Sequence, residues 1–599
     1  MRIRFLPSAL ALSLLVSPGL FGQRTGGGGR TAGPASKPGG PGVVSNPTYG
    51  RTSVPPNPQV HHASDESAIE FRSETVLVQV PVVVTDKAGN HVAGLSRTDF
   101  EVLENGKTQK IASFEAIEAS HAPLASVSVP GKGEFSNLGG NAEAPRTVTI
   151  IALDTINTPF LDQAYGRKQL VKFLAETVDS GQILSLVSIG SRGTKVIHGL
   201  TSDPAELIQA LKKVNGELPG LQGVDIDTQA AAALGTDLPG TANSGFSPGS
   251  TEVNLEDFVI NGDATIARMQ QDRAIEATMR AFLDIAWSVS GIPGKKAVLW
   301  ATAGFPFFLD GPAAVPGGYL SVLYERTMQA LNDAEISVYP VDVRGLVNFS
   351  PSADASRSGG AKGGSAFAQS LAARSWLQTS TLDALKDFAA MTGGRAFYNT
   401  NDLAASFRRA AEDSSSYYLL GYYLDTKNTK PGWRQLKVKV HQPGTEVRAR
   451  SGFLVTNATV NPELSLKTDI GFALTSPFDS TGIPLTVRWR GMTSDGGKKK
   501  VQFGLHVAPE GVTLEGTRNQ LNMEIAVVAV TQKSGAQADS FGQTIKAEPS
   551  QETVAKLKAE GLAYNNNLEL PPGQYTVRFV VRDNLTGKLG SVSAPLTVD

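Results

Sequence analysis

The chain has 599 residues, of which 41% are hydrophobic and 19% are charged, and its net charge is −1, so it is long enough for several globular domains. A charge this close to neutral gives no electrostatic basis for binding nucleic acid or an anionic membrane. The absence of cysteine excludes disulfides, lipid attachment to an N-terminal cysteine, and cysteine-based catalysis or zinc binding.

Residues 1–22 have the features of an export signal. A basic head at residues 1–4 precedes a mostly apolar stretch that Pro7 and Pro18 interrupt, which fits a cleaved signal peptide better than a membrane span. An uncleaved N-terminal anchor is the alternative. We expect an exported protein that is periplasmic, cell-envelope associated or extracellular, with no transmembrane helix beyond this signal segment.

A linker and a small β domain are predicted next. Residues 23–70 are rich in Gly and Pro and predict a disordered linker. Residues 71–118 predict a small β domain, because a strand-like run at 76–85 is followed by a hairpin signal at 105–106, Asn-Gly. Residues 119–145, again rich in Gly, Pro and Ser, predict a second linker.

Strands and helices alternate from 146 to 415, which indicates a parallel sheet built from βαβ units. The first strand, 147–154, is a mostly β-branched run of the buried type that ends in Asp154. Two insertions, near 215–263 and 346–375, have the composition of disordered loops. One helix is predicted to have an apolar face made of Ile275, Met279, Phe282, Ala286 and Val289.

This part of the sequence resembles a von Willebrand factor type A (VWFA) domain of the kind found in exported acidobacterial proteins. The resemblance implies a doubly wound, Rossmann-like α/β domain flanked by small β-sandwich domains. It also implies a metal-ion-dependent adhesion site at the carboxyl ends of the strands. The matching pieces are the strand ending at Asp154, the β region 84–102, Gly199-Leu-Thr-Ser-Asp203, Lys296-Ala-Val-Leu-Trp-Ala-Thr-Ala-Gly304 and Ala390-Met-Thr-Gly-Gly394.

The metal site that the resemblance implies is incomplete. Asp154 and Thr158 match the first acid and the second hydroxyl of the site in functional A domains. Ile156 stands in place of the first hydroxyl and Ala303 in place of the second acid, so two of about five oxygen ligands remain, which is a weak set for Mg²⁺. Two alternatives stay open: Asp342 supplies a further carboxylate, or Asp154 and Thr158 cap the following helix.

The C-terminal third is predicted to be rich in β structure. Residues 416–456 predict a β-hairpin extension, and the short alternating strands of 460–599 predict an immunoglobulin-like β-sandwich. No enzyme motif has a suitable context. Residues 245–249 fit the pattern G-x-S-x-G, which places Ser247 as its nucleophile, but no predicted strand precedes them and no predicted helix follows.

We therefore expect a non-enzymatic, adhesion-type protein that binds an unknown protein partner, and neither nucleic acid nor a small-molecule substrate. No cofactor is firmly expected, and Mg²⁺ at a degenerate site of Asp154 and Thr158 is the one candidate. Phe305 and Phe307 follow a strand end, either as a surface anchor or as core packing. The alternative function is a structural or envelope-assembly scaffold whose A domain binds no metal. The predicted partner-binding residues are Asp154, Thr155, Asn157, Thr158, Phe305 and Phe307.

Overall fold

The computed structural model describes a mixed α/β chain whose strands form five sheets within the described residues. No helix in this part of the chain is long and apolar enough to cross a membrane. The predicted signal segment (1–22) and first linker (23–70) lie outside the described residues. The structure describes residues 75–117, 133–137, 148–176, 182–214, 216, 255–305, 319–346, 381–425, 430, 432–455, 462–495, 497–516 and 518–599.

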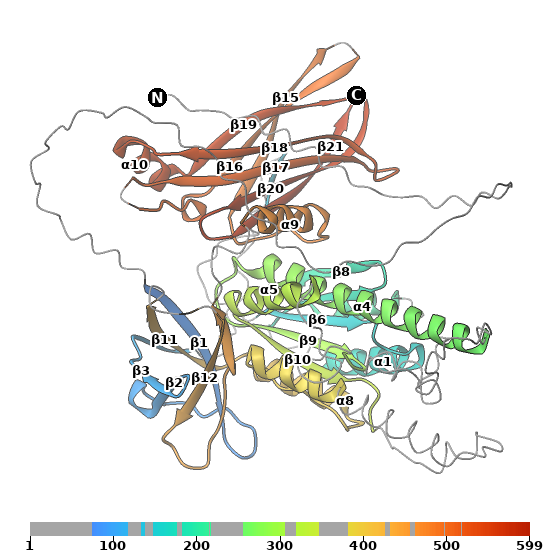
Figure 1. Cartoon of the computed structure of the whole chain (residues 1–599), viewed down its shortest axis with the longest axis vertical. Coiled ribbons are helices and arrows are strands. Elements are labelled where there is room, and N and C mark those ends of the chain that lie inside the picture. The colour runs from blue at the N-terminus through green and yellow to red at the C-terminus, as the bar shows by residue number, and fades with distance from the viewer. Residues whose placement is uncertain are drawn as a thin grey trace, which may run out of the picture. The chain divides into compact units, whose positions relative to one another are not determined.

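Two segments far apart in the sequence form one β structure, called here the paired β unit (Figure 1). The sheets have the orders β13-β1-β11-β4 and β14-β12-β2-β3. Alternate residues of β1, such as Val78 and Val80, enter a core that Leu420 on β11 completes. The predicted β domain (71–118) and hairpin extension (416–456) therefore share one core. The elements are β1 (Thr75–Thr85), a 3₁₀ helix (Arg97–Asp99), β2 (Phe100–Glu104), β3 (Lys107–Gln109), β4 (Ser113–Ile117), β11 (Tyr417–Asp425), β12 (Gly432–Val440), β13 (Glu446–Arg448) and β14 (Gly452–Val455).

A five-stranded sheet lies at the centre of the α/β part. Its strands are β6 (Val148–Asp154), β7 (Ile183–Gly190), β8 (Gly193–Thr201), β9 (Lys296–Thr302) and β10 (Ile336–Asp342). The order is β10-β9-β6-β7-β8, in which β8 is antiparallel to β7 and the other neighbours are parallel. Every residue of β6, β9 and β10 is buried, as is expected of parallel strands with helices on both faces.

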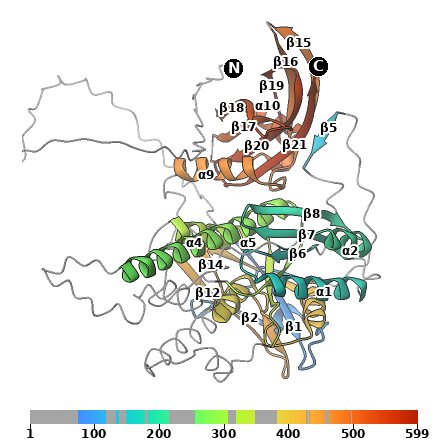
Figure 2. The same ribbon diagram turned by 90° about the vertical axis from the view of Figure 1, so that its right-hand side faces the viewer.

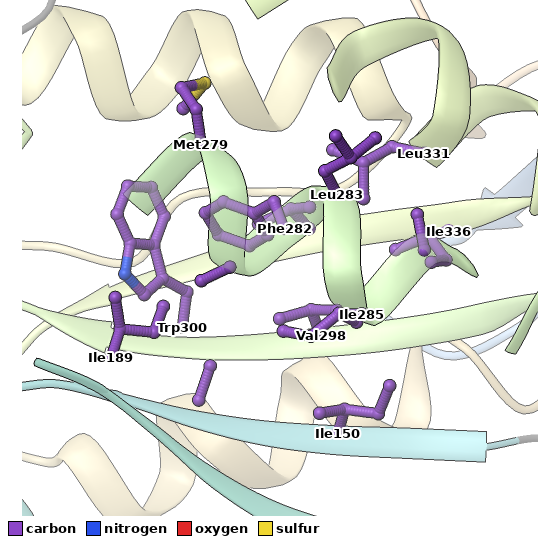
Figure 3. Packing of buried hydrophobic residues seen from close by; sticks show 14 of the residues in the cluster. Ile150, Ile189, Met279, Phe282, Leu283, Ile285, Val298, Trp300, Leu331 and Ile336 are labelled. Carbon is purple, nitrogen blue, oxygen red and sulfur yellow. The ribbon is translucent and has the colours of Figure 1, made fainter. Parts of the chain in front are cut away.

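Helices cover both faces of this sheet. They are α1 (Phe160–Glu176), α2 (Pro204–Lys212), α4 (Leu255–Val289), α5 (Tyr319–Asp333) and α8 (Leu403–Glu412). Helices α1, α2 and α8 share one core with the sheet, and α4 and α5 share another core with its opposite face (Figure 3). The apolar face predicted for α4 is confirmed, because all five of its residues are buried. Helix α4 begins at Leu255, inside the range 215–263 that predicted a disordered insertion.

The C-terminal β unit consists of two four-stranded antiparallel sheets that share one core. The sheet orders are β19-β16-β15-β5 and β18-β17-β20-β21. Strand β5 lies inside the range 119–145, which predicted a linker, and it pairs with β15. The elements are β5 (Glu134–Ser136), α9 (Pro462–Thr475), β15 (Leu485–Asp495), β16 (Lys498–Val507), a 3₁₀ helix (Pro509–Gly511), β17 (Leu521–Thr531), β18 (Gln537–Ala547), α10 (Gln551–Glu560), β19 (Leu562–Leu570), β20 (Gly573–Asp583) and β21 (Leu589–Val598).

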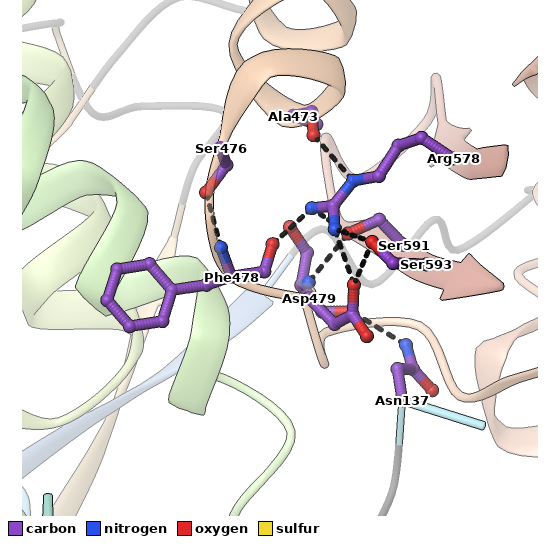
Figure 4. Close-up of polar contacts among 9 residues, drawn as sticks. Asn137, Ala473, Ser476, Phe478, Asp479, Arg578, Ser591 and Ser593 are labelled. Carbon is purple, nitrogen blue, oxygen red and sulfur yellow. Dashed lines mark hydrogen bonds and ion pairs between the residues drawn. The ribbon is translucent and has the colours of Figure 1, made fainter. Parts of the chain in front are cut away.

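A buried arginine holds helix α9 and the loop after it against β20. Arg578 is 7% exposed, and its guanidinium donates to the backbone carbonyls of Ala473 and Phe478. It also donates to the Asp479 carboxylate at 2.5 Å and to the Ser593 hydroxyl at 2.6 Å (Figure 4). Because a buried guanidinium is costly unless its donors find acceptors, this network fixes the position of α9 on the sheet.

The turn that follows the helical residues 381–392 explains the glycines of the run Ala390-Met-Thr-Gly-Gly394. A Cβ atom on Gly394 would lie 1.9 Å from the carbonyl oxygen of Val338 on β10. The Thr392 hydroxyl lies close enough to accept a hydrogen bond from the Val338 N–H, at 3.0 Å. The turn therefore docks its backbone directly on an edge of the sheet, and only glycine allows that approach.

We predict that Gly394→Ala lowers the free energy of unfolding by about 3 kcal/mol, because the added methyl group would force the turn away from β10. Gly199→Ala is the matched control, since a Cβ at Gly199 on β8 meets nothing within 4 Å. Urea unfolding of both variants measures the difference. Equal stability of the two variants would contradict the argument.

Candidate functional site

The candidate site lies where β6 and β9 end. In the sheet, β6 lies between β7, which is the next strand along the chain, and β9. The strand order therefore changes direction at β6. In open α/β sheets, ligands bind in the crevice at such a switch point, just beyond the carboxyl ends of the strands. Asp154 is the last residue of β6 and Thr302 is the last residue of β9, so the two side chains meet at this point.

The Asp154 carboxylate is enclosed by hydrogen-bond donors of its own chain. Its Oδ1 accepts from the Asn157 backbone N–H at 3.0 Å. Its Oδ2 accepts from Asn157 Nδ2 at 2.8 Å, Trp300 Nε1 at 3.0 Å and Thr302 Oγ1 at 2.9 Å. Only 2% of the Asp154 surface is exposed. Four donors therefore occupy the carboxylate at the place where a metal ion would have to approach.

Burial sets the protonation behaviour of this acid. Loss of solvent raises the pKa of the Asp154 carboxyl to about 6, while the hydrogen bonds from Asn157, Thr302 and Trp300 act in the opposite direction. The four donors favour the charged form, and desolvation outweighs them. At neutral pH the carboxylate is still mostly ionised, and its charge depends on these donors because a buried charge without partners is very costly.

The other residues of the predicted metal site supply no free ligand. The Thr158 hydroxyl, 1% exposed, accepts from the Ala303 backbone N–H at 3.1 Å. Ile156 is 7% exposed and belongs to the core on the α4 side of the sheet. None of the hydrogen bonds found for Asp154 and Thr158 among the described residues caps α1, so the capping alternative is not supported.

Asp342 does not complete the site. Both of its oxygens are held by Arg344, with Oδ1 2.9 Å from Nε and Oδ2 2.8 Å from Nη2. Asp342 ends β10, and β9 lies between β10 and the strand of Asp154. The Asp342 carboxylate is therefore engaged by Arg344 and is not free to join Asp154 as a ligand of one Mg²⁺ ion.

The residues at this edge do not fit a Mg²⁺ ion. Across the described parts of the chain, no group of three or more His, Cys, Asp and Glu side chains is arranged to hold a metal. One acid engaged by four donors and one hydroxyl engaged by a backbone N–H do not provide the oxygen-rich, open shell that Mg²⁺ requires.

Trp300 and Thr278 belong to the site although their side chains were not predicted to do so. Trp300 is fully buried and packs edge-on against Phe282 of α4, with ring centroids 5.0 Å apart (Figure 3). Thr278 accepts from Asn157 Nδ2 at 2.9 Å and donates to the Ala274 carbonyl at 2.8 Å. The sequence did contain a signal for Trp300. A buried indole N–H usually finds an acceptor, and Asp154, at the end of the neighbouring strand, is a suitable one.

The residues that were predicted to bind a partner differ in their burial and contacts. Phe305 is 1% exposed and packs on Trp300, with ring centroids 5.6 Å apart, so it is part of the core and not a surface anchor. Thr155 is also buried and donates to the Ile189 carbonyl at 2.9 Å, while Asn157 is partly buried. Phe307 and the run 245–249, which contains Ser247, lie outside the described residues.

A small pocket opens beside the Asp154 carboxylate on the α1 side of the sheet. It encloses about 270 Å³ including its mouth, which is less than the ~300–1,000 Å³ of typical small-molecule sites. Two large apolar side chains at the start of α1, next to this edge, are exposed: Phe160 to 40% and Leu161 to 79%. The lining residues are Leu153, Asp154, Thr155, Thr158, Gln163, Gly166, Arg167, Ala301 and Val343.

Comparison with known proteins gives little to add to this geometry. No model of a protein family matches the sequence, and no curated protein matches it. Among solved structures, one match is the vWF domain of the type V pili tip protein Mfa5 from Porphyromonas gingivalis, with 13% identity over 45% of this chain and 93% of that one. The TM-score is 0.16, so this likeness supports no argument about the fold or the function.

We predict that Thr302→Val destabilises the protein in a pH-dependent way. Removing one hydrogen bond to a buried carboxylate should lower the free energy of unfolding by ~1.5–3 kcal/mol near pH 7.5. Because the folded-state pKa of Asp154, about 6, lies above its ordinary value of 3.8, protonation of Asp154 stabilises the fold at low pH, and this contribution is lost as the pH rises through about 6. The deficit of the variant should therefore shrink below pH 6.

Thr302→Ser is the control for this experiment, because it keeps the hydroxyl. Chemical unfolding of both variants between pH 4.5 and 8 provides the measurement. A deficit of Thr302→Val that stays constant over this range would mean that Thr302 acts through its bonds to the Gly304 backbone and not through the Asp154 charge.

Proposed function

We propose that this chain is an exported, non-enzymatic protein–protein interaction protein of the adhesion type. In this proposal its α/β part is a doubly wound, Rossmann-like VWFA-like domain, and the C-terminal β unit is an immunoglobulin-like sandwich. The sheet order β10-β9-β6-β7-β8 and the helices on both faces support the first assignment. Two four-stranded sheets around one core support the second.

The binding is proposed to be independent of metal. One observation carries this step: the Asp154 carboxylate, which would be the first metal ligand, already accepts four hydrogen bonds from Asn157, Trp300 and Thr302. A metal ion would have to displace donors that hold a buried charge, and the neighbouring Ile156 and Ala303 offer it no oxygen. In this proposal Asp154 stabilises the edge of the sheet, and the surface residues around it bind the partner protein.

The surface proposed to meet the partner is the start of α1. Phe160 and Leu161 are exposed apolar residues beside the switch-point pocket. Exposed apolar anchors next to a cleft are typical of protein-binding surfaces. The pocket is too small for a typical organic substrate, which favours a partner protein over a small molecule.

The alternative function is a structural or envelope-assembly scaffold. Contacts between α4 and the loop before β15 favour it: the Thr481 N–H donates to the Trp287 carbonyl at 2.9 Å, and the Gly291 N–H donates to Thr481 Oγ1 at 2.9 Å. Such contacts are expected if the α/β part serves to hold the C-terminal β unit in place. In a scaffold, the exposed residues of α1 would be dispensable for binding.

We predict that Mg²⁺, Mn²⁺ and Ca²⁺ leave the melting temperature unchanged and produce no heat of binding, because four donors of the chain already hold the Asp154 carboxylate. Thermal melts and calorimetry of the purified chain, with and without chelator, measure this. A metal-dependent stabilisation that disappears in Asp154→Ala would overturn the metal-free proposal.

We predict that Leu161→Asp abolishes capture of the partner from a native envelope fraction, because a charge would replace an exposed apolar anchor. Val322→Asp on α5 is the matched control, since Val322 is also apolar and 62% exposed. Affinity capture followed by mass spectrometry gives the readout. Capture of the same protein by both variants would favour the scaffold.

A further inference from the structure

Strand β5 occupies an edge of the C-terminal β unit (Figure 2). Its three residues are antiparallel partners of three residues of β15, with Ser136 opposite Thr486 and Glu134 opposite Arg488. Strand β15 has 11 residues, so β5 covers only part of this edge. The two strands lie more than 300 residues apart in the sequence, since 354 positions separate Glu134 from Arg488.

The acceptor edge is built around Asn137, which directly follows β5. Asn137 is 9% exposed, and its Oδ1 accepts from the Leu485 N–H at 2.8 Å. Its Nδ2 donates to the carbonyls of Ser480 at 2.6 Å and Ile483 at 2.8 Å. One side chain thus satisfies three backbone groups at the start of β15, and these groups would be costly to leave unpaired when buried.

The remaining contacts are specific for the residues of β5. Phe135 packs against the core of the C-terminal β unit. Glu134 forms an ion pair with Arg488 at 2.6 Å, and the Gly133 carbonyl accepts from the Trp489 N–H at 3.4 Å. The edge therefore recognises an extended segment with an acid, an aromatic residue and an asparagine at fixed spacing. This is recognition by strand addition, in which backbone bonds give affinity and alternate side chains give specificity.

We propose that this edge is a strand-acceptor site, and that β5 of a second copy of the chain can occupy it in place of the chain's own β5. A second copy is the partner whose sequence reproduces every contact of Glu134, Phe135 and Asn137. Exchange of an identical element replaces each contact by the same contact, so it costs little free energy once two chains are close. Reciprocal exchange would join two chains into a closed dimer, and it would do so without the Asp154 site.

The experiment uses the absence of cysteine from the chain. Full-length Ser136→Cys and Thr486→Cys chains are unfolded together in urea, refolded as an equimolar mixture at high protein concentration, and oxidised. Ser136 and Thr486 are direct partners, and the flanking bond from the Asn137 N–H to the Leu485 carbonyl makes them a non-hydrogen-bonded pair. Such pairs have a Cα separation of ~4.5 Å, which allows a disulfide.

The two single-cysteine chains can only form disulfides between molecules. Random collision would give a heterodimer equal in amount to the two homodimers combined. Strand exchange predicts a clear excess of the heterodimer on non-reducing gels, and no such excess when Ser540→Cys on the exposed face of β18 replaces Ser136→Cys. The excess should also disappear when the Ser136→Cys chain carries Phe135→Asp, because a charged residue cannot pack on the core edge.

A heterodimer at or below the random amount would overturn the proposal and leave β5 as a strand that pairs only within its own chain. Circular dichroism of each variant separates this result from misfolding. If Phe135→Asp fails to fold, Asn137→Ala replaces it, since this variant keeps the aromatic contact and loses the three side-chain bonds. Light scattering of the wild-type chain under the same refolding conditions should show dimers in a larger proportion than the heterodimer excess, because half of the exchanged dimers in the mixture join two copies of the same variant and bring no cysteine pair together.

Discussion

The hydrogen bonds to Asp154 are the constraint on which the rest of the α/β part depends. They join the end of β6 to the end of β9 through Thr302 and Trp300, and they join both strands to the following loop through Asn157. Because Asn157 also contacts Thr278, the same acid is linked to helix α4. Burial raises the pKa of the Asp154 carboxyl to about 6, so its charged form depends on the donors that these elements supply. The position of each element at this edge is therefore coupled to the charge of Asp154.

This arrangement also explains how the edge can accommodate a buried acid. A buried charge needs either a metal ion or hydrogen-bond donors. Here the indole of Trp300, a hydroxyl and an amide provide the donors, and the indole simultaneously fills the core on the α4 side, against Phe282 and Phe305. The aromatic cluster and the acid therefore stabilise each other, since the cluster positions the N–H that the carboxylate requires.

Local patterns in the sequence predicted much of the α/β part and little of its connections to the rest. The strand ending at Asp154 and the apolar face of α4 follow from hydrophobic periodicity, and the structure confirms them. The pairing of β1 with β11 and of β5 with β15 is not readable in this way, because partners so distant in sequence leave no local periodic signal. For the same reason the sequence left open whether Phe305 belongs to the core or to the surface, because the fold of the segment around it cannot be read from a local pattern.

Strand β9 connects the candidate site to the paired β unit. Its first residue follows Lys295, whose backbone N–H donates to the Tyr417 hydroxyl at the start of β11, at 2.9 Å. Its last residue, Thr302, holds the Asp154 carboxylate. All seven residues of β9 are buried, and a closely packed interior leaves a strand little room to deform. A partner that shifted the Asp154 edge would therefore act on β9, which contacts the paired β unit at β11, a strand that lies between β1 and β4.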